Sequence, residues 1–218
     1  MKGGDAMEVL RRIAESLQRG EDEAVLELTR QAIERQLPAG RILDEGLIAG
    51  MGVVGERFRA HQIFLPDVLL AAKAMYAGMG LLKPLLAQEG VPLVGKVVIG
   101  SVRGDLHDIG KNLVGIMLKG AGFEVIDLGN DVSPERFVDT ATAEGAPVIG
   151  MSALLTTTMT VMKEVVDLIR QRELAGRVKT IVGGAPVSAE FAHEIGADAY
   201  GFDAANAVDR VKALVGAS

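Results

Sequence analysis

Hydrophobic residues in the first ninety positions recur at helical spacing, and no segment there has the alternation of a half-buried strand. The pattern predicts four helices, which begin and end at capping, glycine and proline signals. They are expected at about residues 5–19, 22–36, 42–58 and 66–84, with the Asp5–Glu8 pair as a capping box and Pro84 kinking or ending the last helix. Four helices with short connections make a small bundle.

The third of these helices is unusually rich in glycine. Within residues 42–58 stand Gly46, Gly50, Gly52 and Gly55. Each glycine costs a helix about 1 kcal/mol relative to alanine. We therefore expect another backbone to come close to this helix.

From Lys96 onward the pattern changes to apolar runs of strand length that alternate with amphipathic helices. The five runs are KVVIGSV, FEVIDLG, PVIGMSALL, KTIVGGAP and AYGF. Such alternation is typical of a doubly wound, flavodoxin-like or Rossmann-like parallel sheet with helices on both faces. The chain is thus predicted to be an α/β protein with a helical bundle over residues 1–90, a linker near 89–95 and an α/β domain over residues 91–218.

Charge and composition narrow the function. Lys and Arg number 23 against 29 Asp and Glu, a net charge of −6, which argues against nucleic acid as a partner. Cysteine is absent, which excludes disulfides, thiolate metal sites and a cysteine nucleophile. The start of the chain has no apolar signal region, and the long uncharged stretch 145–162 is interrupted by proline and threonine. We expect a cytoplasmic protein that binds no membrane.

In a doubly wound sheet, ligands bind at the carboxyl ends of the strands, and the most informative loop follows the first strand. It reads Gly104-Asp105-Leu106-His107-Asp108-Ile109-Gly110. The Asp-x-His spacing puts a carboxylate beside an imidazole, which orients the other ring nitrogen as a ligand or base. Two alternatives remain: a glycine-rich phosphate-binding turn, and Asp105 as a cap of the next helix.

A metal at this loop would be unusual, because zinc normally needs three protein ligands. The remaining histidines, His61 and His193, are distant in sequence. A metal held in a macrocycle, in contrast, needs only one histidine from the protein.

Three elements in order carry a resemblance to cobalamin-binding proteins. DLHDIG, then Ser152-Ala153-Leu154, then Gly183-Gly184 match the pattern DxHxxG…SxL…GG. The segments MGVVGERF (51–58) and IFLPDVLLAAKAM (63–75) resemble the helical cap of methionine synthase and of corrinoid proteins that serve methanol, methylamine and methoxyaromatic methyltransferases. The resemblance covers about residues 5–215 and leaves no room for a separate substrate domain.

The resemblance implies roles for single residues. His107 would be the lower axial ligand of cobalt, and Asp105 would form a hydrogen bond with the other ring nitrogen of His107. The hydroxyl of Thr158 would complete this hydrogen-bonded relay, at a position where methionine synthase has serine. Ser152 and Leu154 would line the cleft of the displaced nucleotide tail. The full set of implied cofactor-binding residues is Gly104, Asp105, Leu106, His107, Asp108, Ile109, Gly110, Gly115, Ser152, Leu154, Thr156, Thr158, Gly183, Gly184 and Ala204, with Phe58, Leu65 and Val68 over the upper corrin face.

The function so implied is that of a corrinoid carrier in one-carbon metabolism. It would bind a cobalamin or related cobamide, base-off and histidine-ligated, and shuttle a methyl group between two methyltransferases. Implied partners are a donor-side methyltransferase, an acceptor-side methyltransferase that uses a folate or thiol, and a reductive activation protein. Two alternatives remain: the cobalamin-binding subunit of an adenosylcobalamin-dependent mutase, and a cobalamin-based sensor. Nothing indicates a substrate site of the chain's own, so it is best described as a methyltransferase subunit.

Overall fold

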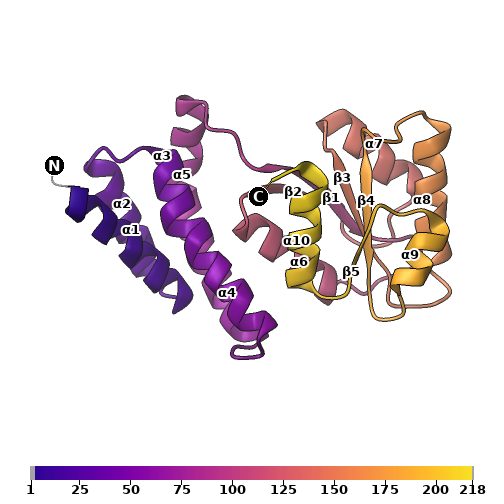
Figure 1. Ribbon diagram of the computed structural model, residues 1–218, viewed down its shortest axis with the longest axis horizontal. Helices are drawn as coiled ribbons and strands as arrows, with labels where there is room; N and C mark the ends of the chain where they lie inside the picture. The colour runs from indigo at the N-terminus through magenta and orange to yellow at the C-terminus, as the bar shows by residue number, and fades with distance from the viewer. Residues whose placement is uncertain (1–2, 218) are drawn as a thin grey trace. The chain divides into compact units, whose positions relative to one another are not determined.

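The computed structural model describes residues 3–217, and it describes side chains from Asp5 onward. Residues 1, 2 and 218, the outer ends of the two expected domains, lie outside the described residues. The chain divides into two compact units (Figure 1). One comprises the residues up to Leu93 with Gly120–Gly122, and the other comprises Val94–Lys119 and the chain from Phe123 onward.

The first unit is helical, and its described residues up to Leu93 contain no strand. Its helices are α1 (Gly3–Gln18), α2 (Asp22–Glu34), α3 (Ala39–Arg41), the π-helical η1 (Ile42–Ile48), α4 (Ala49–Arg59) and α5 (Leu65–Glu89). Ile13, Leu17, Val25, Leu47 and Leu82 are fully buried, as the helical spacing of apolar residues predicts.

The glycine-rich helix is a continuous run of α3, η1 and α4. A Cβ at Gly50 would lie 3.0 Å from the backbone of Ala14 on α1, so the prediction of a close backbone is confirmed there. At Gly46 the neighbour is the side chain of Ile13, at 3.1 Å. The prediction is wrong for Gly52, whose Cβ would meet nothing within 4 Å.

The capping box predicted at Asp5 is wrong, and of the two outcomes predicted at Pro84 the end of the helix is excluded. Helix α1 begins at Gly3, so Asp5 lies inside its first turn and does not cap it. Helix α5 does not end at Pro84 but continues to Glu89. Proline removes the hydrogen bond to the carbonyl four residues earlier, that of Gly80. Both residues are exposed, so water can satisfy this carbonyl.

Among the described residues, α5 alone is long and apolar enough to cross a membrane by length and composition. Core helices of soluble proteins pass the same test. Within the helical unit α5 packs along α2, and Val68, Ala71, Ala72, Ala74, Met75 and Leu82 are buried. Packing therefore accounts for the apolar face of α5, and a cytoplasmic location stays a prediction.

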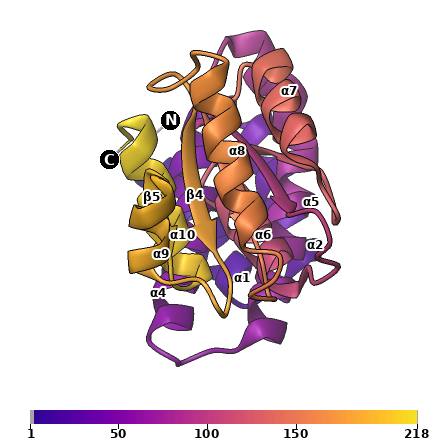
Figure 2. The same cartoon turned by 90° about the vertical axis from the view of Figure 1, so that its right-hand side faces the viewer.

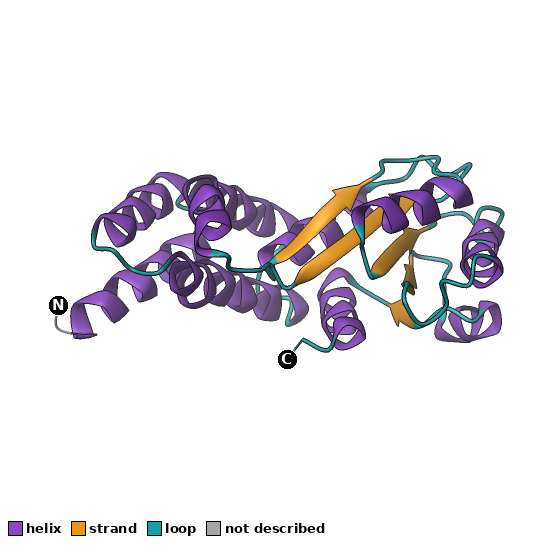
Figure 3. Ribbon diagram, turned by 90° about the horizontal axis from the view of Figure 1, so that it is seen from above, coloured by secondary structure: helices purple, strands orange, loops and turns teal. Residues whose placement is uncertain are grey.

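The second unit is a five-stranded parallel sheet in the order β2-β1-β3-β4-β5. Its strands lie side by side with helices around them (Figures 2 and 3). Its strands are β1 (Gly95–Ser101), β2 (Phe123–Asp127), β3 (Val148–Ser152), β4 (Lys179–Gly183) and β5 (Ala199–Gly201). Its helices are α6 (Ile109–Gly120), α7 (Pro134–Glu144), α8 (Thr160–Gln171), α9 (Ala189–Ile195) and α10 (Ala204–Val215). Helices α6 and α10 lie on one face and α7, α8 and α9 on the other (Figure 1). The predicted fold class is confirmed.

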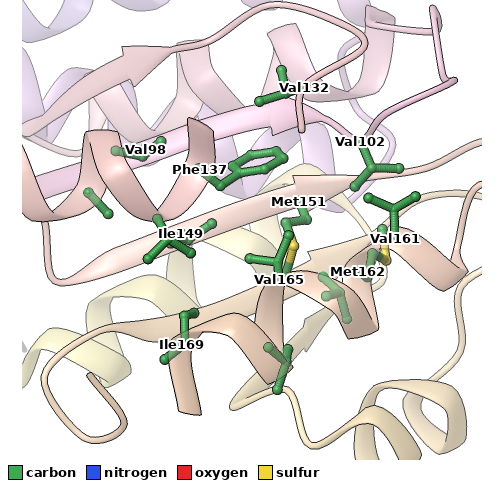
Figure 4. Packing of buried hydrophobic residues seen from close by; sticks show 14 of the residues in the cluster. Val98, Val102, Val132, Phe137, Ile149, Met151, Val161, Met162, Val165 and Ile169 are labelled. Atoms are coloured by element: carbon green, nitrogen blue, oxygen red, sulfur yellow. The ribbon is translucent and has the colours of Figure 1, made fainter. Parts of the chain in front are cut away.

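A core of aliphatic side chains with one aromatic ring joins the sheet to α7 and α8 (Figure 4). Phe137 is fully buried, and a Cβ at Gly100 of β1 would lie 2.8 Å from its ring. Gly100 therefore makes room for this ring. This packing holds β1 and β3 side by side. The loops that follow the two strands therefore begin at a fixed distance from each other.

Candidate functional site

The strand order reverses between β1 and β3. From β1 the chain moves to β2 on one side, and from β3 it moves to β4 and β5 on the other. At such a switch point the loops after the two strands diverge and leave a crevice at the carboxyl edge of the sheet. Here the two loops cover residues 102–108 and 153–159.

Asp105 joins these two loops. Its carboxylate is fully buried. Oδ1 accepts hydrogen bonds from the backbone N–H of His107 at 3.0 Å and lies 2.8 Å from His107 Nδ1. Oδ2 accepts from Leu154 N at 2.7 Å, Leu155 N at 3.3 Å and Thr158 Oγ1 at 2.8 Å. Because these donors belong to its own loop and to the opposite loop, and none to α6, Asp105 is not a helix cap.

Burial alone would raise the pKa of Asp105. Hydrogen bonds from the backbone of Leu154 and His107 and from the side chains of His107 and Thr158 outweigh it, and they hold the pKa well below its usual range. The carboxylate is therefore ionised at neutral pH, and an ionised carboxylate can only accept hydrogen bonds.

This fixes the chemistry of His107. Since Asp105 can only accept, Nδ1 of the neutral imidazole carries the hydrogen and Nε2 keeps the lone pair that can bind a metal. The side chain is 52% exposed, and Nε2 has no hydrogen-bond partner among the described residues. The carbonyl of His107 accepts from the buried hydroxyl of Ser101 at 2.6 Å. The ring is thus fixed at Nδ1 by Asp105, while Nε2 is available to a ligand.

Thr158 completes the chain of contacts that the sequence predicts. It is buried, and its Oγ1 lies 2.8 Å from Asp105 Oδ2 and 2.9 Å from the carbonyl of Leu155. One hydroxyl hydrogen can serve only one of these acceptors at a time. The structure brings His107, Asp105 and Thr158 together, and a role in proton transfer stays a prediction.

Large apolar side chains on the loop of His107 and at the start of α6 face solvent. Leu106 is 71% exposed and Ile109 is 74% exposed. Leu154, Leu155 and Phe202, on the loops after β3 and β5, are also exposed. Apolar side chains gathered at a strand-end crevice indicate a binding surface for a ligand with a large apolar face.

The glycine pair after β4 has a structural reason. Gly184 has φ +129°, and a Cβ there would lie 1.9 Å from the carbonyl oxygen of Ala153. At Gly183 the Cβ would lie 2.8 Å from the carbonyl oxygen of Gly201. Only glycine fits at position 184, and it lets the loops after β3 and β4 touch through their backbones. Ala204 is buried at the start of α10.

The other predicted residues of the α/β unit are scattered around this edge. Ser152 and Asp108 are half-buried, while Gly104, Thr156 and Gly110 are exposed. Gly115 is buried, and its Cβ would lie 2.7 Å from Cδ1 at the end of the Ile99 side chain, so packing of α6 on β1 by itself favours a small residue there.

The three predicted cap residues belong to the helical unit. Val68 is fully buried, while Phe58 and Leu65 are half-buried. Val68 therefore presents no surface to a ligand in this structure. The assignment of all three to the upper corrin face stays a prediction.

Sequence reasoning missed several residues at the site. Ser101 holds the His107 carbonyl, and the loop after β2 contributes Asn130 and Asp131. Buried Lys111 forms an ion pair with Asp127 at 2.6 Å, which ties the first turn of α6 to the end of β2. Only Asn130 and Asp131 follow a predicted strand directly, and this position did not single them out.

No group of three or more His, Cys, Asp or Glu side chains that could hold a metal ion exists among the described residues. A metal bound at His107 would need its other ligands from a macrocycle. A single oriented imidazole surrounded by exposed apolar side chains fits such a group.

Comparison with known proteins agrees with this geometry. Two family models, each described as a B12 binding domain, match residues 95–211 and 9–83. The chain is 40% identical to a corrinoid protein from Desulfitobacterium hafniense, over 96% of this chain and 99% of that protein. It belongs to the B12-binding corrinoid proteins. A dimethylamine corrinoid protein from Methanosarcina barkeri is 42% identical, over 95% of this chain and 98% of that one.

Solved structures of corrinoid proteins have the same fold. The methanol:cobalamin methyltransferase complex from Methanosarcina barkeri matches with a TM-score of 0.85 at 33% identity, over 97% of this chain and 81% of that one. A cobalamin-binding protein from Desulfitobacterium hafniense matches with a TM-score of 0.78 at 32% identity, over 94% and 98%. The prediction of a corrinoid protein with a helical part and a B12-binding α/β part is confirmed.

Proposed function

We propose that this corrinoid protein carries a methyl group between a donor-side and an acceptor-side methyltransferase. A bound cobalt corrinoid supplies a metal centre that can take up and release the methyl group. The observation that carries the proposal is the imidazole of His107, fixed by buried Asp105 with Nε2 free and surrounded by exposed apolar side chains.

The chain's own contribution is ligation and orientation. His107 would bind cobalt through Nε2 in place of the cofactor's own base, so the corrinoid would be base-off. Asp105 and Thr158 would keep the hydrogen on Nδ1 and the ring in one orientation, as acceptors and donors around metal-binding histidines do. Leu106 and Ile109 would pack beneath the macrocycle and keep water away from it.

The edge of the macrocycle would also meet polar groups. Oδ1 of Asn130 is buried without a hydrogen-bond partner among the described residues, while its Nδ2 donates to Leu106 O. A corrinoid carries amide side chains, whose N–H groups could satisfy this oxygen. Ser152, Leu154 and Gly184 would line the cleft of the displaced nucleotide tail.

The partners are proposed from the relatives. The names of two relatives refer to dimethylamine and methanol systems, which supports a small methylated compound as the methyl source. We propose a folate or thiol acceptor on the second methyltransferase and a reductive activation protein. The helical segments favour the carrier over a mutase subunit or a sensor, since corrinoid proteins match the chain over both units.

The test is ligation by His107. The full chain is loaded with cobalamin, reduced to the cobalt(II) form, and measured by electron paramagnetic resonance with natural and with nitrogen-15 histidine. We expect nitrogen coupling that changes with the label and disappears in His107→Ala, while corrinoid binding is retained at lower affinity. Coupling that ignores the label, or persists in His107→Ala, would overturn the assignment.

The methyl-carrier function has a separate test. The loaded protein is mixed with candidate donor-side methyltransferases and a panel of methylated compounds, and transfer to the corrinoid is followed by absorption. We expect transfer with at least one donor. Binding of adenosylcobalamin in preference to methylcobalamin or hydroxocobalamin would instead support the mutase or sensor alternative.

A further inference from the structure

The loop after β2 touches the His107 loop at three consecutive residues. Asp131 Oδ1 accepts from Gly104 N at 2.7 Å, and Asp131 N donates to the carbonyl of Asp105 at 3.1 Å. Asn130 Nδ2 donates to the carbonyl of Leu106 at 3.1 Å. These three contacts hold the backbone on which the carboxylate and imidazole of the Asp-x-His pair stand.

Asp131 itself has an unusual backbone. Its φ is +53°, in the left-handed region that residues other than glycine rarely occupy, although Asp and Asn tolerate it best. The residue is exposed, so burial of its side chain does not impose this conformation. In this conformation the side chain of Asp131 bonds to Gly104 N while its backbone N–H bonds to the carbonyl of Asp105.

The loop does not depend on the Asp131 side chain for its place in the fold. Ser101 N donates to the carbonyl of Gly129 at 3.0 Å, and Val132 N donates to the carbonyl of Ser101 at 3.0 Å. Val132 is fully buried in the core and pairs with Val102. Removal of the carboxylate therefore leaves both ends of the loop attached to β1.

We propose that Asp131 is a positioning residue for His107. Its carboxylate fixes Gly104 and its N–H fixes Asp105, so that the Gly104–His107 turn has one geometry and the imidazole points in one direction. The inference rests on the proposed function in one respect, since it takes His107 as the residue whose orientation matters. A merely structural Asp131 would affect folding and leave the orientation of the imidazole unchanged.

Three substitutions separate the carboxylate from the backbone conformation. Asp131→Asn keeps both an acceptor oxygen and tolerance of positive φ. Asp131→Gly keeps the conformation without the acceptor, and Asp131→Ala loses both. Asp139→Ala is the control, because Asp139 is another exposed aspartate with a single ion pair, to Arg172 on the far end of α8.

The first readout needs no cofactor. In the apo full-length chain, nitrogen-15 NMR of the imidazole reports the tautomer and the number of conformations of His107. We expect one Nδ1–H form in the natural protein, in Asp131→Asn and in Asp139→Ala. Asp131→Ala and Asp131→Gly should show a mixture of forms in protein that is still folded, and Asp131→Gly, which keeps the positive φ without strain, should have a denaturation midpoint close to that of the natural protein.

The second readout uses the cobalamin-loaded chain. In Asp131→Ala and Asp131→Gly the fraction of cobalt(II) with histidine coupling should fall several-fold, and Asp131→Asn should restore it. Unchanged His107 signals in the alanine and glycine variants would overturn the proposal, as would signal loss that only parallels unfolding. If the natural protein lacked histidine coupling altogether, the proposed function would fail, while the apo measurement would still decide the role of Asp131.

Discussion

At the scale of single residues, one buried carboxylate organises the site. Asp105 accepts hydrogen bonds from its own loop and from the loop after β3. Its position two residues before His107 predicts only the contact with His107. Its low pKa follows from these donors, which outweigh the penalty of burial. The charge is therefore part of the native structure of the chain.

Asp105→Asn should lower the free energy of unfolding of the apo protein by about 1–3 kcal/mol at pH 7, because charged hydrogen bonds are lost. The folded-state pKa lies below the unfolded one, so this stabilisation is present above the unfolded pKa of about 3.9 and is lost as the pH falls further. Urea denaturation of both proteins between pH 7 and pH 2 measures it. A stability difference that stays constant over this range would contradict the low pKa.

Thr158 tests the next contact. Thr158→Val keeps the shape but removes the hydroxyl, and should cost about 1–2 kcal/mol because Asp105 Oδ2 loses a donor. Thr158→Ser keeps the hydroxyl and should cost less. Denaturant unfolding of the apo proteins compares them, and the idea fails if the serine variant is as unstable as the valine variant.

At the scale of elements, the site depends on how closely neighbouring loops approach. The parallel sheet brings strand ends together, but the contact between the loops after β3 and β4 requires the absence of a side chain at Gly184. The same holds where α4 packs on α1 at Gly50, whose neighbour is the backbone of Ala14. At Gly115, where α6 packs on β1, the close neighbour is instead the end of the Ile99 side chain.

Gly184→Ala should destabilise the protein by about 2–5 kcal/mol, through positive φ and a clash with Ala153, and should weaken corrinoid binding. Gly145→Ala is the matched control, since Gly145 also has positive φ but no atom within 4 Å of its Cβ. It should cost only about 1–2 kcal/mol. Denaturant unfolding measures the loss of stability in both variants. Equal losses would show that the contact with Ala153 adds nothing to the cost of positive φ.

At the scale of the whole molecule, the chain is two compact units, and the described contacts of the candidate site lie within the α/β unit. The chain matches corrinoid proteins over nearly its full length. The α/β unit has its own core, sheet and site residues.

A fragment of residues 94–218 should therefore fold alone and bind cobalamin with histidine ligation. Circular dichroism and denaturant unfolding test the fold, and absorption titration tests the binding. An unfolded fragment, or one without a bound corrinoid, would show that the helical unit is required. Faster photolysis of methylcobalamin bound to the fragment than to the full chain would support the predicted place of Phe58, Leu65 and Val68 over the upper corrin face.

The sequence by itself determined the order and type of the elements, because helical and strand periodicity record which faces are buried. The resemblance to the DxHxxG and SxL patterns also predicted that Asp105, His107 and Thr158 form one set, and the structure brings the three side chains together. It did not determine that α5 passes through Pro84, because this depends on water reaching the carbonyl of Gly80.

Only the tertiary structure decided which residues hold the motif in place. Ser101 and Asp131 are ordinary residues in sequence. Asp131 reaches the His107 loop because the pairing of β1 with β2 places the loop after β2 beside it, and Ser101 reaches the carbonyl of His107 because the turn after β1 folds back. Gly115 is the opposite case. The resemblance implied a cofactor contact there, but packing against the side chain of Ile99 already favours glycine at this position. Periodicity and motifs are local, whereas a hydrogen bond between two loops depends on strand order and register, which no local pattern contains.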